Sequence, residues 1–225
     1  MNTEAADYGK RFRDHWKRFL ERFKITSDLQ QNVFSDLWRR YGEKHRIYHG
    51  IKHPVLLLDE LEIVRRDVPE WFTGRDQDLA IELAIWNNGV VYNTRRRDNK
   101  EKSSERVLDH AHDLGISAIV GAEAALVVLA TKHLKKPVAL SAQIVTDIDL
   151  SLLASPWETF VRNTLDIREE YRPNVSDNDW RTGRKDFLEG MAKWSSIYTT
   201  NYFFMKYEVR AQANILRSYR ETFGN

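Results

Sequence analysis

Apolar side chains recur along much of the chain at the spacing of amphipathic α-helices. Near the N-terminus, Phe12, Trp16, Phe19 and Phe23 follow one another at intervals of three or four residues. Because an α-helix turns once in roughly 3.6 residues, this interval gathers the four rings on one helix face. The pattern predicts an aromatic stripe that packs against a core.

The rest of the chain repeats this pattern, with polar residues where helices are expected to begin. Ser117 is expected to cap a long apolar helix that ends near His133, and Ser103 or Ser104 to cap the helix before it. The apolar run 89–92 resembles a short strand, but no alternating strands accompany it. The other expected helices cover 29–41 (capped by Thr26 or Ser27), 76–91, 141–153, 157–171, 176–194 and 202–223, and one more begins near Ile51–Lys52. The sequence therefore predicts an all-α fold in a single helical domain.

The composition is that of a nearly neutral globular protein, with 35 Lys and Arg against 33 Asp and Glu in 225 residues and a formal net charge of +2. This balance argues against general nucleic-acid binding, which needs a concentrated basic surface. The absence of cysteine excludes disulfides, thiolate nucleophiles and zinc–thiolate sites. No run reaches the roughly 18 apolar residues of a membrane-spanning helix, and residues 1–10 lack the apolar segment of a secretory signal. We expect a cytoplasmic protein with no membrane partner, and the sequence leaves a homo-oligomer open.

Three histidines stand in one short segment. His45, His49 and His53 are spaced by four residues within H-R-I-Y-H-G-I-K-H. A rigid loop–helix junction can aim imidazole nitrogens at one metal ion; the alternative is that these are surface or capping residues bonded to the backbone. His133, at the expected end of the apolar helix, either interacts with that helix terminus or points into a pocket.

Two acids and two arginines add candidates. If T-D-I-D-L-S-L-L is helical, Asp147 and Asp149 point about 200° apart, so only one faces a shared site, and we favour Asp147. The alternative is a helix N-cap followed by an acid. Arg172 in R-E-E-Y-R and Arg184 in W-R-T-G-R-K fit either phosphate recognition or solvated helix faces.

Taken together, these segments resemble the HD superfamily of predicted metal-dependent phosphohydrolases, in the branch with an R-x-Y-H-N-x-x-H motif. Arg46, Tyr48, His49 and His53 match this motif, with Gly50 in place of its asparagine. The resemblance implies one HD-like helical domain over 1–225, in which the helices of 1–44 pack on a motif-bearing core at 45–215. Later matches follow in the family's order along nearly the whole chain: Ala84-Ile85-Trp86, Val90-Val91-Tyr92, Asp98-Asn99, Ser103, Thr131-Lys132-His133, Asp147, Asp149, Leu150, Arg168, Glu170, Tyr171, Gly183-Arg184, Ile197-Tyr198, Glu208, Ala211 and Asn214.

The chain departs from the family at its namesake residues. Where the family reads W-F-H-D-V-V-Y-D, this chain has Asn88 and Gly89 in place of the His-Asp pair and Asn93 in place of the last aspartate. Lys100 stands in the next loop where an acid is expected. In the family, a histidine, the His-Asp pair and a later aspartate hold one or two divalent metals, which activate water and polarise phosphate oxygens. Glycine cannot ligate a metal through a side chain, and neutral asparagine is a poor ligand, so two ligands are lost.

These implications predict a degenerate phosphohydrolase homologue that binds a phosphorylated small molecule or a nucleotide, with metal-dependent hydrolysis lost or altered. Two alternatives stay open: an enzyme with a rebuilt metal site or metal-free histidine acid–base chemistry, and a non-catalytic regulatory or interaction protein. A residual metal site would consist of His49 and Asp147, for Mn, Fe, Ni, Zn or Mg. The expected catalytic residues are His49, His53 and His133, and the expected ligand-binding residues are Arg46, Tyr48, Asn88, Lys132, Arg172 and Arg184.

Overall fold

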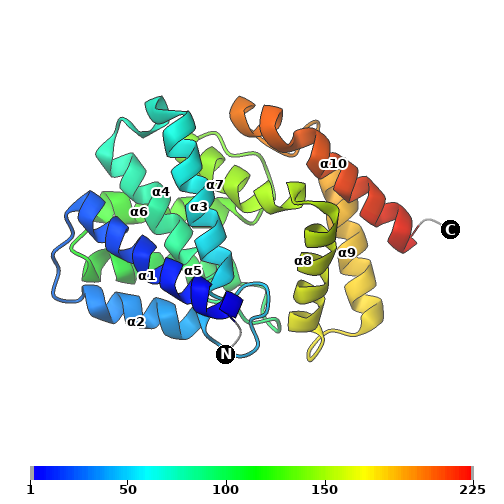
Figure 1. Cartoon of the computed structure of the whole chain (residues 1–225), viewed down its shortest axis with the longest axis horizontal. Coiled ribbons are helices and arrows are strands. Elements are labelled where there is room, and N and C mark those ends of the chain that lie inside the picture. Colours follow the sequence, from blue (N-terminus) through cyan, green and yellow to red (C-terminus); the bar gives the residue numbers. More distant parts are fainter. Residues whose placement is uncertain (1–2, 224–225) are drawn as a thin grey trace. The chain divides into compact units, whose positions relative to one another are not determined.

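The computed structural model describes residues 3–223, with side chains from residue 7 onward, and every regular element in this range is a helix (Figure 1). The predicted all-α fold class is thereby confirmed. The chain divides into two compact units, residues 1–146 and 147–225, which we call unit 1 and unit 2 and describe separately. The expected single domain stays a prediction. None of the helices in the described range is both long enough and apolar enough to cross a membrane.

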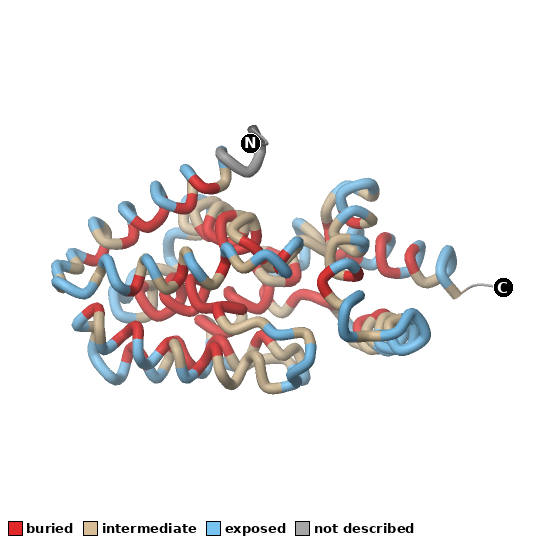
Figure 2. Tube along the Cα trace, turned by 90° about the horizontal axis from the view of Figure 1, so that it is seen from below, coloured by how far each residue is buried: buried red, intermediate tan, exposed pale blue. Residues whose placement is uncertain are grey.

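Helix α4 lies at the centre of unit 1. It contacts α1, α3, α5 and α6, and every residue from Leu79 to Asn87 is buried, which explains its nearly continuous apolar sequence (Figure 2). The elements of unit 1 are α1 (Thr3–Phe23), α2 (Gln30–Tyr41), α3 (Lys52–Asp67), the 3-10 helix η1 (Pro69–Phe72), α4 (Arg75–Asn87), α5 (Asn99–Asp113), α6 (Ala118–Ala130) and the start of α7 (Leu140–Leu150). Unit 2 contains the end of α7, the 3-10 helix η2 (Ser151–Ala154), α8 (Trp157–Tyr171), α9 (Asp177–Ala192) and α10 (Asn201–Phe223).

The aromatic stripe of α1 packs against Trp86 of α4, as its spacing predicts. Phe12 and Trp16 meet the Trp86 ring nearly at right angles, with ring centroids 5.0 and 5.3 Å apart. Phe19 completes this cluster at 6.3 Å, and Trp86 itself is fully buried. Its Nε1 has no hydrogen-bond partner, and the edge-on geometry lets an indole N–H face an aromatic ring instead.

Helix α4 ends four residues before the predicted end at 91. Asn88 is extended, with φ −68° and ψ 90°, and Gly89 has a φ of +93°. A left-handed φ of this kind favours glycine, because a side chain would clash with the backbone. The apolar residues after Gly89 suggested a longer helix, but this glycine turns the chain out of it.

Helix α5 begins at Asn99, so the prediction that Ser103 or Ser104 caps it is wrong. Both serines lie inside the helix and are buried. The Ser103 hydroxyl instead accepts a hydrogen bond from the Val91 N–H (3.1 Å) and donates to the Val91 carbonyl (3.3 Å). A serine that looked like a cap therefore ties α5 to the loop after α4.

The remaining helix starts agree with the sequence in part. Ser117 caps α6 by accepting from the Val120 N–H, and Ser176 caps α9 by accepting from the Asp179 N–H. The predicted helix over 29–41 is confirmed as α2, but the prediction that Thr26 or Ser27 caps it is wrong. The helix begins at Gln30, and Ser27 accepts from the Leu29 N–H in the turn before it.

Unit 2 is organised around two buried carboxylates that bind the segment before α10. The N–H groups of Ile197 and Tyr198 donate to Glu208, at 2.8 to 3.1 Å. The next two, of Thr199 and Thr200, donate to Asp147 at 2.8 Å, as does the Thr200 hydroxyl. Four successive backbone N–H groups thus find acceptors on two buried carboxyl side chains, so this irregular segment keeps its backbone hydrogen bonds.

We predict that Asp147→Asn loosens this segment. An amide offers one acceptor oxygen where the carboxylate offers two, so at least one buried N–H is left unsatisfied, which costs about 2 kcal/mol. Hydrogen exchange of the amides at 199 and 200 should therefore accelerate about thirty-fold.

The matched control is Asp149→Asn, on the same helix but half-buried. It should leave the exchange of both amides nearly unchanged. Equal acceleration in the two variants would contradict the role given to Asp147.

Candidate functional site

A buried guanidinium holds the loop that follows α4. Arg46 is 8 % exposed, and its Nη1 and Nη2 donate to the backbone carbonyls of Gly89 (2.7 Å) and Val90 (2.9 Å). Its Nε donates to the Glu43 carboxylate at 2.9 Å. Because buried carbonyls outside a helix need donors, Arg46 fixes the path of the loop. Contact of Arg46 with a ligand stays a prediction.

The predicted histidines and Tyr48 come together beside this loop. The His49 ring stacks on Tyr92, with centroids 4.2 Å apart and planes 28° apart. His53, which is buried, lies 5.2 Å from His49 between ring centroids, and Tyr48 lies 4.7 Å from His49. His45 Nε2 lies 3.0 Å from the Tyr92 carbonyl oxygen. The loop–helix junction therefore places His49 beside His53 and Tyr92, while His45 bonds the backbone. Catalytic or metal-binding roles for these histidines stay predictions.

A lysine ammonium contacts the buried side chain of Asn88. Asn88 is 1 % exposed, and its Oδ1 accepts hydrogen bonds from Lys100 Nζ and, at 3.0 Å, from the Thr131 hydroxyl. Lys100 comes from the first turn of α5 and Thr131 from the residue after α6. The Asn88 amide oxygen thus joins the start of α5 to the residue after α6.

Lys132 and His133 follow Thr131 at the end of α6. Lys132 Nζ pairs with the Glu101 carboxylate, and this hydrogen bond lowers the pKa of Glu101. His133 is half-buried and has a left-handed φ of +53°, a conformation uncommon for histidine. The turn therefore presents a lysine and an imidazole next to each other after the apolar helix.

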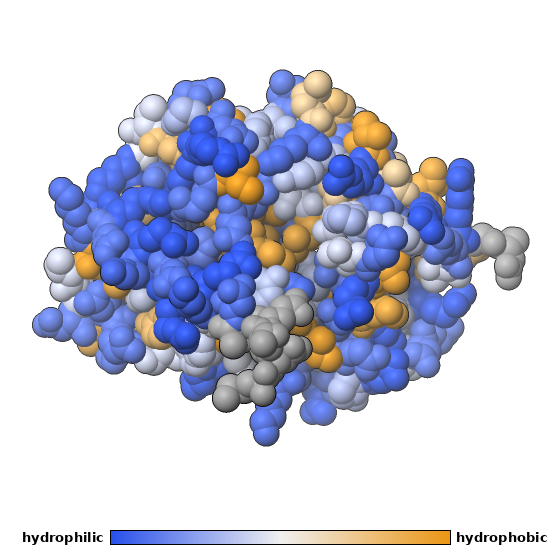
Figure 3. Space-filling model, viewed as in Figure 1, coloured by the Kyte–Doolittle hydropathy of each residue, from blue (hydrophilic) through white to orange (hydrophobic). Residues whose placement is uncertain are grey.

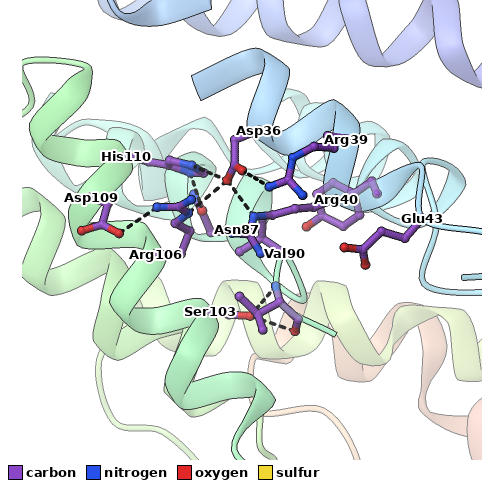
Figure 4. Close-up of polar contacts among 12 residues, drawn as sticks. Asp36, Arg39, Arg40, Glu43, Asn87, Val90, Ser103, Arg106, Asp109 and His110 are labelled. Carbon is purple, nitrogen blue, oxygen red and sulfur yellow. Dashed lines mark hydrogen bonds and ion pairs between the residues drawn. The ribbon is translucent and has the colours of Figure 1, made fainter. Parts of the chain in front are cut away.

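A second polar network contacts Asn87, the last residue of α4 (Figure 4). The Asn87 amide donates to the Leu83 carbonyl at 2.9 Å, and its Oδ1 lies 2.8 Å from His110 Nδ1. His110 Nε2 lies 3.2 Å from the Asp36 carboxylate. Asp36 also accepts from three arginines: Arg39 at 2.6 Å, Arg40 at 2.7 Å and Arg106 at 3.0 Å. The network thus links α2, α4 and α5.

Asp36 is held in its ionised form. Burial acts to raise its pKa, but hydrogen bonds from His110 and Arg40 outweigh burial and hold the pKa well below its ordinary value. The carboxylate therefore stays charged wherever the protein is folded and near neutral pH.

The donor groups do not fit a divalent metal site of the family's kind. Among residues 3–223, no three or more His, Asp or Glu side chains are placed to bind one metal ion. The residual metal site of His49 and Asp147 stays a prediction. Asp147 is fully buried, and its carboxylate accepts the three hydrogen bonds described above. Gly89 offers no side chain at the position of the family's aspartate.

The two predicted arginines of the C-terminal half lie in unit 2. Arg184 Nη2 donates to the Thr164 hydroxyl at 3.0 Å, and its guanidinium lies over the Phe160 and Phe187 rings. Arg172 is exposed and pairs with Glu169 at 2.7 Å. Both side chains have structural contacts within unit 2, and their contact with a ligand stays a prediction.

Sequence reasoning did not select Lys100 and Thr131 as site residues. The sequence analysis noted Lys100 only as a basic residue where the resembled family has an acidic one. It noted Thr131 only as part of the match Thr131-Lys132-His133. The partners Asp36, Asn87 and His110 gave no local signal, because they come from three helices far apart in the sequence. Comparison of the chain with protein-family models, with curated proteins and with solved structures gives no match.

We predict that Asp36→Asn lowers stability in a pH-dependent manner. The folded-state pKa of Asp36 lies below the unfolded value of about 3.9, so the unfolded chain binds the proton more readily. The charged carboxylate therefore stabilises the fold above that pH, and this contribution is lost as the pH falls below it. Urea unfolding at pH 7 should show a loss of about 2–4 kcal/mol in the variant, and the difference from wild type should shrink below pH 4.

Asp109→Asn serves as the control, because Asp109 pairs with Arg106 of the same network but is 62 % exposed. We expect a change within about 1 kcal/mol at any pH, as for other exposed ion pairs. If the loss of stability in Asp36→Asn were the same at every pH, the result would contradict stabilisation of the fold by an ionised Asp36 carboxylate.

Proposed function

We propose that unit 1 binds the phosphate group of a phosphorylated small molecule or nucleotide without a metal ion, as a degenerate relative of the HD phosphohydrolases. The observation that carries the proposal is the contact of Lys100 with Asn88. By the resemblance, Asn88 stands where the family has a metal-ligating histidine. An ammonium group at this position supplies positive charge where the family uses a metal ion.

The chemistry around Lys100 suits an anion. Lysine binds phosphate as a point charge through up to three donors. Its side chain is half-buried, so the charge is partly shielded from water and acts more strongly than on an open surface. The acids nearest in sequence, Asp98 and Glu101, pair with Arg96 and Lys132.

The imidazoles of His49, His53 and His133 supply further nitrogen donors or acceptors in unit 1. His49 stacks on Tyr92 of the loop that carries Asn88, so an imidazole lies beside this loop.

Metal-dependent hydrolysis is not part of the proposal. In the family the metal activates water and polarises phosphate, but the donor set of this chain does not fit that group. A bound phosphoester would be held by Lys100 and its neighbours without an activated nucleophile. Binding without turnover is the outcome that this arrangement supports best.

We predict that Lys100→Met weakens AMP binding about ten- to hundred-fold, since it removes a charge-assisted hydrogen bond. Isothermal titration calorimetry in the presence of EDTA measures this directly. Lys100→Arg keeps the positive charge and should retain most of the affinity.

The matched control is Lys102→Met. Lys102 lies two residues further along α5 and pairs with Glu105 at 2.7 Å, so its removal should leave AMP affinity unchanged. AMP binding that needs added metal, or that is equally weak in both methionine variants, would contradict the proposal. Hydrolysis of AMP by the wild-type protein would contradict binding without turnover.

A further inference from the structure

Helix α10 of unit 2 carries two parallel rows of exposed side chains. The first row is apolar for most of its length: Met205 is 76 % exposed, Val209 84 % and Leu216 50 %. These positions recur with the three- and four-residue spacing of one helix face. Figure 3 shows hydrophobic side chains (orange) among hydrophilic ones (blue) on the surface over α10. We call Met205, Val209, Gln212, Leu216 and Tyr219 the apolar row.

The second row lies one residue further along and is basic. Lys206, Arg210, Arg217 and Arg220 are all exposed, and they follow the apolar row one residue further along except at 213, which is alanine. Glu221 pairs with Arg217 at 2.8 Å, which still leaves an excess of positive charge. We call these four residues the cationic row. Single exposed apolar residues are common on protein surfaces, but two such rows side by side extend over four helical turns. A patch of this extent is typical of an interaction surface.

The apolar row also forms one wall of a groove within unit 2. The groove has a volume of about 360 Å³ and runs between α9 and α10. Leu216 and Tyr219 line it from α10. Leu188, Met191, Trp194 and Ile197 line it from α9 and the segment after it. Glu189 also lines it, and its carboxylate accepts from Tyr219 and pairs with Lys185. A hollow of this size admits one or two large apolar side chains from a partner.

Charge and shape select the occupant. A second copy of α10 would bring a second cationic row against the first, and like charges oppose such contact. A membrane surface offers negative charge but is flat, and it would leave the groove unfilled. An amphipathic helix with acidic residues beside its apolar stripe matches the two rows and fills the groove with its apolar anchors.

We infer that the α9–α10 surface of unit 2 docks an acidic amphipathic helix of a partner protein. Apolar side chains of that helix enter the groove and cover the apolar row, and its carboxylates face the cationic row. This surface lies apart in sequence from the proposed phosphate site, and neither proposal depends on the other.

The test uses a synthetic helical peptide with leucines at positions 1, 5, 8 and 12 and glutamates in the adjacent row. Fluorescence anisotropy should show binding with a Kd of roughly micromolar magnitude, typical of a small helix–groove contact. A peptide with lysines in place of the glutamates should bind at least about ten-fold more weakly.

Val209→Glu and Arg210→Glu should each weaken binding of the acidic peptide about ten-fold or more. Leu165→Glu and Arg162→Glu are the controls, because both residues are exposed on α8 of the same unit and make the same chemical change. Equal binding of the two peptides, or equal effects of test and control variants, would overturn the inference. So would binding to phosphatidylserine vesicles in the absence of peptide binding, or self-association that Arg210→Glu strengthens.

Discussion

The turn at Asn88–Gly89 is the constraint on which the candidate site depends. Helix α4 runs through the middle of unit 1, and the chain leaves it through a glycine with a φ of +93°. This turn brings the Asn88 side chain to Lys100 and Thr131. It also directs the following residues to where Arg46 holds their carbonyls. A residue with a side chain at 89 would strain this turn, so the candidate site depends on the glycine at this position.

In both units, buried charged side chains form hydrogen bonds with backbone that lies outside the helices. In unit 1 the Arg46 guanidinium satisfies two carbonyls of a loop, and in unit 2 the Asp147 and Glu208 carboxylates satisfy four N–H groups. The arginine thus donates to carbonyl oxygens, and the carboxylates accept from N–H groups. Arg46, Asp147 and Glu208 are also among the residues that resemble the HD family. Their hydrogen bonds to the backbone explain why these positions hold arginine, aspartate and glutamate, without any catalytic role.

Local patterns predicted most of the fold and little of the site. The spacing of Phe12, Trp16 and Phe19 predicted the buried face of α1, and the Ser117 cap predicted the start of α6. The end of α4 was missed because the residues after Gly89 are apolar and continue the hydrophobic pattern of the helix. The hydrophobic pattern does not indicate the backbone conformation that a glycine adopts. Ser103 was taken for a cap because its tertiary partner, Val91, lies twelve residues away. The same reason hid the network around Asp36, whose members meet only after the helices pack.

The central claim is that an ammonium group now stands where the HD family holds a metal ion. A crystal structure of the protein with AMP, grown in the presence of a chelator, tests it most directly. The account predicts a phosphate oxygen within about 3 Å of Lys100 Nζ and no metal between them. Phosphate bound away from Lys100, or crystals that bind AMP only when a divalent metal is restored and seen beside His49, would contradict it.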